Sequence, residues 1–547
     1  MRPILDVAKD LGLAPDDLMS FGPHMAKLTL PAMRRLDAKG PSGRIVLVSA
    51  INPTKFGEGK TTVSIGLAQG MRRRGLKVAN ALREPSLGPI FGVKGGGTGG
   101  GKARLEPSAR INMHFTGDMH AITAAHNLLA ALVDNAINFG APVEMESRSI
   151  LWRRVLDMND RFLRKITIGL GGKANGVPRE DGFDITAASE VMAVLALSRD
   201  LKDLKARLGR ILVGYDKKGE PVTAAKLGAH GAMAALLHDA LLPNLVQTAE
   251  GGPAFVHGGP FGNIAHGCNS IIATRSAAAV ADYVVTEAGF GFDLGAEKFF
   301  DIKCRTAGLW PRAVVLVVTA RALRFHGGDT AGKETGAKAV AALEKGLGNM
   351  EKHVETAKAF GFDPVIAINR FTQDSEEELV AIERACKERG LAAARASGFL
   401  EGGAGMEALA DLVAAAAEKP AAKQPSYMYA LEDTAEEKVR SIAKKVYGAK
   451  DVVFTKDAVR DLDKARALGF GNLPICMAKT QMSLSDDASV AGRPRDFEMT
   501  VRSVRVAAGA GYLLALTGDI MTMPGLPAVP AANAIDLTDD GEVVGIT

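Results

Sequence analysis

Short runs of consecutive apolar residues alternate along this chain with stretches whose apolar positions recur at helical spacing. Continuous apolar runs are typical of parallel strands buried on both faces, and their alternation with helices indicates an α/β architecture. We therefore expect a mostly parallel sheet covered by helices. The clearest strand candidates are residues 45–49, 77–82, 283–286, 313–319 and 364–369.

Polar or glycine-rich segments directly follow three of these strands. They read Arg83-Glu-Pro-Ser-Leu-Gly, Glu287-Ala-Gly-Phe-Gly and Asn369-Arg-Phe. In open parallel sheets, ligands bind outside the carboxyl ends of the strands. The pattern therefore predicts one shared site at this edge of the sheet.

The chain, at 547 residues, is too long for a single hydrophobic core. We expect a large domain over residues 1–355, with an insertion at about 150–275 where helical patterns dominate. Two smaller α/β domains are expected over residues 356–455 and 456–547.

Composition narrows the classes of function. The net charge of +5 is spread over the whole length, and no Lys/Arg block carries interleaved aromatic residues, so we expect no nucleic-acid partner. The four cysteines are widely separated without a C-x-x-C pair, which argues against a zinc site or a disulfide framework. No signal-peptide pattern or membrane-spanning apolar run is present, so we expect a cytoplasmic protein with no membrane partner.

The strongest functional signal follows the first strand candidate, in Ala50-Ile-Asn-Pro-Thr-Lys-Phe-Gly-Glu-Gly-Lys60-Thr61-Thr62. A strand, a glycine loop, Lys-Thr and a helix together form a phosphate cradle, because loop N–H groups and the helix N-terminus attract anions. Lys60 can reach terminal phosphates, and the hydroxyl of Thr61 or Thr62 can ligate magnesium. Thr54 stands where the motif usually has its first glycine. The pattern predicts a P-loop-containing nucleotide-hydrolase-like domain; the alternative is a glycine turn capped by a lysine.

Two neighbouring segments offer further chemistry. Arg83, at a strand end, is placed to neutralise charge on a transferred phosphoryl or acyl-phosphate group; the alternative is a surface pair with Glu84. The segment Lys94-Gly-Gly-Gly-Thr-Gly-Gly-Gly-Lys102 is either a lid over a substrate or a solvated loop.

Two polar clusters remain open to both functional and structural interpretation. In Asn112-Met-His-Phe-Thr-Gly-Asp-Met-His120, Asp118 or His114 is a candidate base or magnesium relay, against a purely structural turn. In the run from Gly258 to Ser270, Asn263, His266 and Asn269 either bind a ligand or cap a helix.

Three loop phenylalanines are candidates for covering flat rings. Phe290 lies between glycines after a strand, Phe371 follows Asn369-Arg370, and Phe399 precedes Glu401-Gly-Gly-Ala-Gly. Aromatic side chains at such positions can sandwich a heterocycle, although packing in the core is the commoner use.

Together these motifs resemble the formate–tetrahydrofolate ligase family over essentially the whole chain. The matching segments are Gly57-Glu-Gly-Lys-Thr-Thr62, Leu82-Arg-Glu-Pro-Ser-Leu-Gly-Pro89, Ile111-Asn-Met-His-Phe-Thr-Gly-Asp118, Trp152-Arg-Arg-Val-Leu-Asp-Met-Asn-Asp160, Gly259-Pro-Phe-Gly-Asn-Ile-Ala-His-Gly267, Leu294-Gly-Ala-Glu-Lys-Phe-Phe-Asp-Ile-Lys-Cys304 and Met477-Ala-Lys-Thr-Gln-Met-Ser-Leu-Ser-Asp-Asp487. Their common order along the chain makes the resemblance far more specific than any single motif.

The resemblance implies ATP-dependent ligation of formate to tetrahydrofolate through formyl phosphate, giving 10-formyltetrahydrofolate, ADP and phosphate. It implies Mg²⁺, activation by K⁺ or NH₄⁺, and a homotetramer. Residues 1–355 would then bind the nucleotide and 356–455 would form the folate side.

The resemblance also assigns residues. Lys60 and Arg83 would be catalytic, Arg83 holding formate and formyl phosphate, and we add Asp118 as the candidate base. Phe371 and Phe399 would bracket the pterin. The expected ATP-binding residues are Thr54, Gly57, Glu58, Gly59, Lys60, Thr61, Thr62 and Phe290, with Thr61 also expected at Mg²⁺.

The chain departs from the family's usual residues at several positions. Phe399 replaces a tryptophan and Glu401 a lysine, and Lys55-Phe56 replaces Pro-Ala in the phosphate loop; the C-terminus also differs. Three other classes remain to be distinguished: a different acyl-phosphate ligase of the dethiobiotin-synthetase kind, a nucleotide switch that binds partners, and a dehydrogenase. Ligases of the dethiobiotin-synthetase kind are typically far shorter than this chain. A nucleotide switch should carry an Asp-x-x-Gly segment after a strand. A dehydrogenase is disfavoured because the glycine loop of this chain ends in Lys-Thr.

Overall fold

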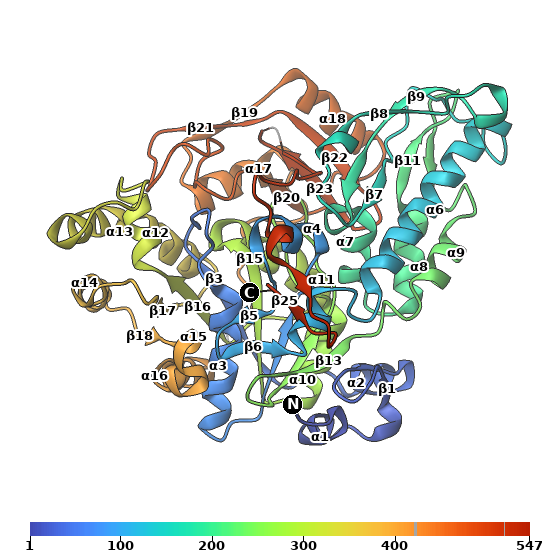
Figure 1. Cartoon of the computed structure of the whole chain (residues 1–547). Helices are drawn as coiled ribbons and strands as arrows, with labels where there is room; N and C mark the ends of the chain where they lie inside the picture. The colour runs from blue at the N-terminus through green and yellow to red at the C-terminus, as the bar shows by residue number, and fades with distance from the viewer. Residues whose placement is uncertain (421–423, 519, 547) are drawn as a thin grey trace.

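The computed structural model describes residues 1–547 except 421–423, 519 and 547, and it has a mixed α/β fold (Figure 1). Its centre is a sheet of twelve strands. Seven neighbouring strands run parallel, in the order β14-β4-β15-β3-β16-β17-β18. They are β14 (Pro253–Val256), β4 (Val78–Leu82), β15 (Tyr283–Gly291), β3 (Arg44–Ala50), β16 (Ala313–Val318), β17 (Val365–Asn369) and β18 (Ala393–Ala396). All five strands predicted from the apolar runs are among them.

Antiparallel strands complete one side of the sheet. The strand β13 pairs antiparallel with β14, β2 and β6. The outer strands β1 and β5 pair with β2 and β6. Their bounds are β1 (Leu18–Ser20), β2 (Ala26–Leu28), β5 (Gly99–Gly100), β6 (Ala103–Glu106) and β13 (Asn244–Thr248).

Both faces of the sheet are covered because the strands are apolar on both sides. Alternate β3 residues enter different cores: Val46 and Val48 pack with helices α3 (Lys60–Arg73) and α16 (Glu407–Glu418), whereas Leu47 enters the core that contains α13 (Gly336–Ala359). The helices α1 (Ile4–Asp10) and α10 (Ile271–Val280) contribute to a third core. The sheet is therefore a rigid support with its strand ends left available for loops.

The order of the strands places β3 between β15 and β16. From β3 the chain passes through α3 to β4, which lies on the β15 side of β3. Later it passes from β15 to β16, which lies on the opposite side of β3. Such a change of direction opens a crevice at the carboxyl ends of the strands in α/β sheets. The loop after β3 lies at this point.

The segment expected to be a helical insertion, residues 150–275, is mixed rather than helical. It contains short strands β7 (Arg154–Leu156) to β12 (Pro221–Thr223), and it ends with β13 and β14 of the main sheet. Of the stretch 223–242, only α9 (His230–Leu236) is helical. Gly228, with φ of +71°, lies in the turn between β12 and α9, a conformation that favours glycine. The other helices here are α7 (Glu190–Leu197) and α8 (Leu201–Arg210).

The last third of the chain continues the sheet before it forms separate layers. The expected domain limit at residue 355 lies inside helix α13, and the strands β17 and β18 beyond it pair with the main sheet. Two small sheets follow, β19–β21 and β20–β23–β22, with helices α17 (Ala435–Ile442) and α18 (Lys456–Ala467). Their strands are β19 (Asp451–Phe454), β20 (Ile475–Ala478), β21 (Glu498–Val501), β22 (Ser503–Ala507) and β23 (Tyr512–Leu516).

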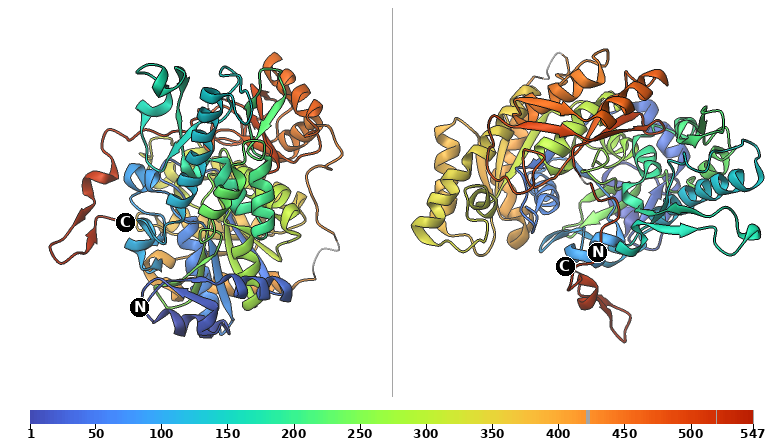
Figure 2. Two further views of the ribbon diagram at one scale, coloured as in Figure 1. Left: turned by 90° about the vertical axis from the view of Figure 1, so that its right-hand side faces the viewer. Right: turned by 90° about the horizontal axis from the view of Figure 1, so that it is seen from above.

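A C-terminal arm ends the chain. The hairpin of β24 (Asp536–Leu537) and β25 (Val543–Val544) projects from the body in both views of Figure 2. None of the helices in the described ranges has both the length and the apolar character needed to cross a membrane.

Candidate active site

The phosphate loop connects β3 to α3 at the centre of the sheet. Gly57 and Gly59 have φ of +75° and +68°, so both occupy the left-handed region that side chains disfavour. Gly59 also has no room for a Cβ atom, which would lie 2.5 Å from Nδ2 of Asn369. The loop therefore needs glycine at both positions to turn directly into the helix.

Two side chains fix the direction of the loop peptides. Nη2 of Arg321 donates to the carbonyl of Gly57 at 2.6 Å, and Nδ2 of Asn369 donates to the carbonyl of Glu58 at 2.9 Å. In a trans peptide the N–H points opposite to the C=O. The N–H groups of Glu58 and Gly59 therefore point away from Arg321 and Asn369.

These N–H groups belong to a longer unpaired series. Within the described residues, the backbone N–H groups from Glu58 to Thr62 donate to no protein acceptor. The last three belong to the first turn of α3, where an α-helix leaves its N–H groups unpaired. Five such donors at a helix N-terminus form an anion-binding site of the predicted kind.

Glu58 braces the loop from inside. Its buried carboxylate accepts from the N–H of Thr54 at 2.7 Å through Oε1 and from the hydroxyl of Thr319 through Oε2. These two hydrogen bonds hold Thr54 and Glu58 in the loop. The loop is therefore shaped although Thr54 stands where the motif usually has a glycine.

Lys60 and Thr61 begin α3 with charged neighbours. The Thr61 hydroxyl donates to Oε2 of Glu287 at 2.9 Å. Lys60 keeps some solvent exposure, but the surrounding protein removes enough hydration to lower the pKa of its amino group to about 8, with Glu287 opposing the shift and Arg83 adding to it. Below about pH 8 the lysine is therefore a weakly hydrated cation at the end of the amide series.

Arg83 lies on the same side of the sheet as Glu287. Its Nη2 is 3.7 Å from Oε1 of Glu287, its Nη1 donates to the carbonyl of Pro260 at 3.3 Å, and its buried Nε has no partner among the described residues. A Cβ atom at Gly289 would lie 2.9 Å from Nη1, so glycine lets the guanidinium approach the backbone. The alternative, a surface pair of Arg83 with Glu84, is not what holds Arg83, and Glu84 is buried.

Lys94 adds a third cation. It ends the π-helical turn Ile90–Lys94 after the Arg83 loop. Its side chain is exposed, but the surrounding protein removes enough hydration to lower the pKa of its amino group, with the charge of Arg83 adding to the shift. Lys60, Arg83 and Lys94 thus form a positive group around Glu287. The sequence did not indicate that Lys94 belongs to this positive group, because the glycines after it favoured the interpretation of a flexible lid or loop.

Phe290 has an uncommon backbone conformation. Its φ of +58° is left-handed, a region that bulky side chains rarely occupy outside functional sites. Its ring covers Gly262, where a Cβ atom would lie 3.0 Å from Cδ2. Phe290 directly follows Gly289, whose Cβ position lies 2.9 Å from Nη1 of Arg83, so this strained residue adjoins the cation group.

The two phenylalanines expected at the pterin both lie beside the start of α3. A Cβ atom built on Gly59 would be 3.9 Å from the ring of Phe371, and one built on Gly100 would be 3.0 Å from the ring of Phe399 and 3.9 Å from the Thr62 hydroxyl. The guanidinium carbon of Arg321 lies 4.8 Å from the centre of the Phe371 ring. Phe399 is 50% exposed, so its ring is available to a ligand.

Asp118 lies in a separate buried network. Lys27, which is fully buried, donates to its carboxylate at 2.9 Å, and Nδ2 of Asn244 donates at 2.8 Å. Burial and the Asp118 charge raise the pKa of Glu84 well above its ordinary range. The contacts of Asp118 therefore link it to Glu84, the neighbour of Arg83, and not to the phosphate loop.

Two residues that build the cradle, Thr319 and Arg321, were not singled out in advance, and Asn369 was named only within a strand-end segment. Thr319 directly follows β16, Arg321 lies in the first turn of the next helix, α12 (Ala320–His326), and Asn369 ends β17; β16 and β17 are the strands on one side of β3. Their positions at or just after strand ends were the available signal, but only the folded sheet shows that they face one loop. Across the residues described, no group of three or more His, Cys, Asp or Glu side chains is arranged to hold a metal ion.

Comparison with known proteins agrees with this arrangement. The family model for formate–tetrahydrofolate ligase matches residues 1–547. The formate–tetrahydrofolate ligase of Myxococcus xanthus (strain DK1622) is 58% identical over 548 residues, covering 100% of this chain and 99% of the relative. A match of this extent leaves no part of the fold outside the family, and the chain belongs to the formate–tetrahydrofolate ligases.

Proposed function

We propose that this enzyme ligates formate to tetrahydrofolate with ATP, through formyl phosphate, and releases 10-formyltetrahydrofolate, ADP and phosphate. The observation that carries the proposal is the series of unpaired N–H groups from Glu58 to Thr62 beside Lys60 and Arg83. The N–H donors suit the phosphate groups of ATP, and the two cations suit the negative charge that shifts when the γ-phosphoryl group is transferred.

In the first step a formate oxygen attacks the γ-phosphorus of ATP and ADP leaves, giving formyl phosphate. Lys60 and the loop amides would hold the β- and γ-phosphates. Arg83 would pair with formate and the transferred phosphoryl group, since its planar fork matches two oxygen atoms and its Nε is free among the described residues. Positioning and charge neutralisation supply most of the catalysis in such transfers.

In the second step the aryl amine N10 of tetrahydrofolate attacks the formyl carbon. The C–O bond breaks, phosphate leaves, and the amine loses a proton. Phe371 and Phe399 would hold the flat pterin next to the loop, because both rings lie beside the start of α3.

Mg²⁺ fits the donor set at Thr61 and Glu287. Both present hard oxygen atoms at the start of α3, which is the ligand type that Mg²⁺ prefers. With nucleotide bound, the ion would spread the charge of the phosphates. Phe290 would cover the adenine, and the domain would be of the P-loop-containing nucleotide-hydrolase-like type.

The wider properties of the family extend the proposal. We expect activation by K⁺ or NH₄⁺, a homotetramer and a cytoplasmic location. Comparing rates in K⁺ and Na⁺ salts, and measuring the mass of the assembly in solution, tests the first two.

The experiment that tests the route follows the formate oxygen. With ¹⁸O-formate, ATP and tetrahydrofolate, the formyl phosphate route places one formate oxygen in the released phosphate. Unlabelled phosphate would contradict the intermediate. In parallel, ADP release should require formate and should fall sharply when tetrahydrofolate is omitted; release that ignores formate would contradict the ligase assignment.

A further inference from the structure

Asn52 is a buried residue that the chemistry above does not use. It lies between β3 and the phosphate loop, two residues before Thr54, and is fully buried. Each of its polar groups has a protein partner. A buried residue whose backbone and side-chain polar groups are all hydrogen-bonded is held in one position.

The backbone of Asn52 is held by two histidines. Nε2 of His353 lies 3.1 Å from its N–H, and Nε2 of His326 lies 2.9 Å from its carbonyl oxygen. Burial lowers the pKa of His353 to about 4 and also lowers the pKa of His326. Both rings are therefore neutral near pH 7, so no charge is buried with the loop.

His326 has a defined tautomer. Its Nδ1 accepts from the N–H of Gly492 at 3.1 Å, so its proton must lie on Nε2, which donates to Asn52. One imidazole thus connects the segment before β21 with the residue before the phosphate loop.

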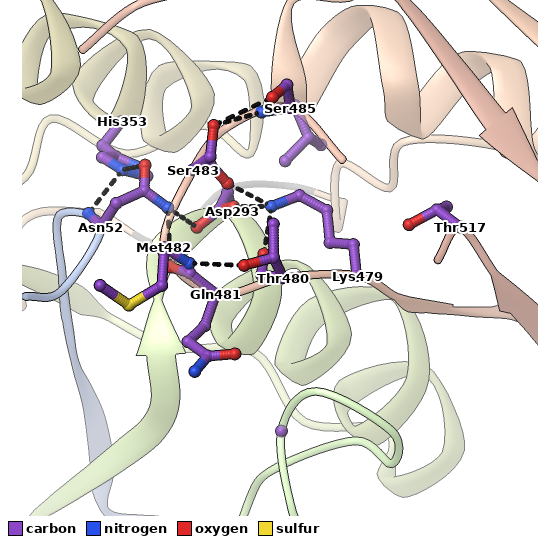
Figure 3. A network of polar contacts seen from close by, with 12 residues as sticks. Asn52, Asp293, His353, Lys479, Thr480, Gln481, Met482, Ser483, Ser485 and Thr517 are labelled. Carbon is purple, nitrogen blue, oxygen red and sulfur yellow. Dashed lines mark hydrogen bonds and ion pairs between the residues drawn. The ribbon is translucent and has the colours of Figure 1, made fainter. Parts of the chain in front are cut away.

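The side chain of Asn52 reaches a second connection. Its Nδ2 donates to Oδ1 of Asp293 at 3.1 Å, and the other oxygen of Asp293 pairs with Lys479 at 3.1 Å (Figure 3). Lys479 and Asp293 are both fully buried, and Lys479 also donates to the carbonyls of Thr480 and Ser483. Figure 3 shows Asn52, Asp293 and Lys479 side by side although they come from three distant segments.

The backbone at Gly291 also packs closely against Asp293 and Asn52. A Cβ atom at Gly291 would lie 2.4 Å from Oδ1 of Asp293 and 3.5 Å from Cα of Asn52. Gly291 follows the strained Phe290, so the same contacts fix the segment expected to cover the adenine. Pro53 then joins Asn52 to Thr54 with a restricted φ angle, which limits how far the two can move independently.

We propose that Asn52 is a positioning residue that fixes the phosphate loop against the Asp293–Lys479 ion pair, so that the C-terminal segment 479–492 sets the geometry of the nucleotide site. This inference rests on the proposed nucleotide site. It deepens that proposal by naming the part of the chain that aligns the loop amides.

The test compares two isosteric substitutions in the full-length enzyme. Asn52→Asp removes the Nδ2 donor and places a second carboxylate against Asp293. Asn127→Asp is the control, because this substitution also removes an Nδ2 donor, the one that bonds to the carbonyl of Val155 at 3.0 Å, but in helix α6 (Asp118–Phe139) and not in the phosphate loop.

We expect Asn52→Asp to raise the ATP KM and the ADP dissociation constant at least tenfold, with the KM for tetrahydrofolate within about twofold. Asn127→Asp should lower the melting temperature without changing either constant. Wild-type nucleotide constants in a folded Asn52→Asp enzyme would overturn the inference. Absence of nucleotide binding by the wild-type enzyme would instead overturn the proposed function.

A second pair of variants decides the matter if Asn52→Asp does not fold. His326→Ala removes the donor to Asn52, whereas His326→Gln keeps an amide donor near the position of Nε2. We expect weakened ADP binding in the alanine variant and recovery in the glutamine variant. Equal ADP binding by both would overturn the inference.

Discussion

The phosphate loop and the two phenylalanines beside it share one edge of the sheet, but the protein holds them in different ways. The loop is fixed by Arg321, Asn369 and Thr319, and both of its glycines have left-handed φ angles that other residues adopt only with strain. The ring of Phe399 is half exposed, with no comparable set of bonds. The difference suits the proposed ligands: stabilising a moving charge requires fixed dipoles, whereas stacking on a flat ring tolerates an open slot.

The largest effect should come from breaking the fixed region. We predict that Lys60→Ala lowers kcat about a hundredfold or more, because one charged contact aimed at the transition state contributes several kcal/mol in such sites. Steady-state ligation with saturating substrates, together with a melting curve, measures it.

Lys55→Ala is the control for that substitution. Lys55 lies in the same loop but is exposed, with its Nζ over the ring of Phe56 at 5.0 Å. It should retain nearly normal turnover. Normal turnover in a folded Lys60→Ala enzyme would remove Lys60 from the phosphate site.

Arg83→Lys should give the next largest effect. Lysine keeps the charge but loses the planar fork and the packing against Gly289, so we expect kcat to fall by roughly tenfold to a hundredfold while ATP still binds. Arg74→Lys, in an exposed pair with Asp411, is the matched control. If ATP affinity falls and turnover does not, Arg83 contacts the nucleotide instead.

The same contrast explains what the sequence could predict. The strands of the parallel sheet and the glycine loop were predictable, because apolar runs and the spacing of Gly, Lys and Thr depend on neighbouring residues. Arg321 and Asn369 could not be assigned, since they meet Gly57 and Glu58 only through pairing of β3, β16 and β17.

The insertion shows the opposite limit. Residues 150–275 carry helical patterns, yet β13 and β14 complete the main sheet, because strand pairing over long separations overrides local preference. The residue type made Asp118 a candidate base, which stays a prediction. Its contact with Lys27 could not be predicted, because Lys27 is 91 residues away in sequence.

Substitutions in the open region should act on folate alone. We predict that Phe371→Ala and Phe399→Ala each raise the tetrahydrofolate KM about tenfold or more, because an aromatic contact contributes ~0.5–1.5 kcal/mol beyond the buried area that is also lost. The KM values for ATP and formate should change little. Phe399→Trp should lower the folate KM, since a larger ring offers a wider platform. Unchanged folate constants with lower melting temperatures would make both rings packing residues.

The smallest effect is a pH dependence that only the fixed region should show. The pKa of Lys60 is lowered to about 8, so its amino group is charged below pH 8 and loses its proton as the pH rises through that value. If only the charged form binds phosphate well, the apparent ADP dissociation constant should be about tenfold higher at pH 9 than at pH 7, because roughly a tenth of the lysine stays protonated one unit above the pKa.

Lys60→Met is the control: it should bind ADP weakly at both pH values and lose this dependence. Calorimetric titration with ADP at pH 7, 8 and 9 measures it, and a wild-type enzyme whose ADP affinity is flat across this range would mean that the Lys60 charge does not hold the nucleotide. Tetrahydrofolate binding, which depends on rings rather than on this lysine, should stay level over the same range.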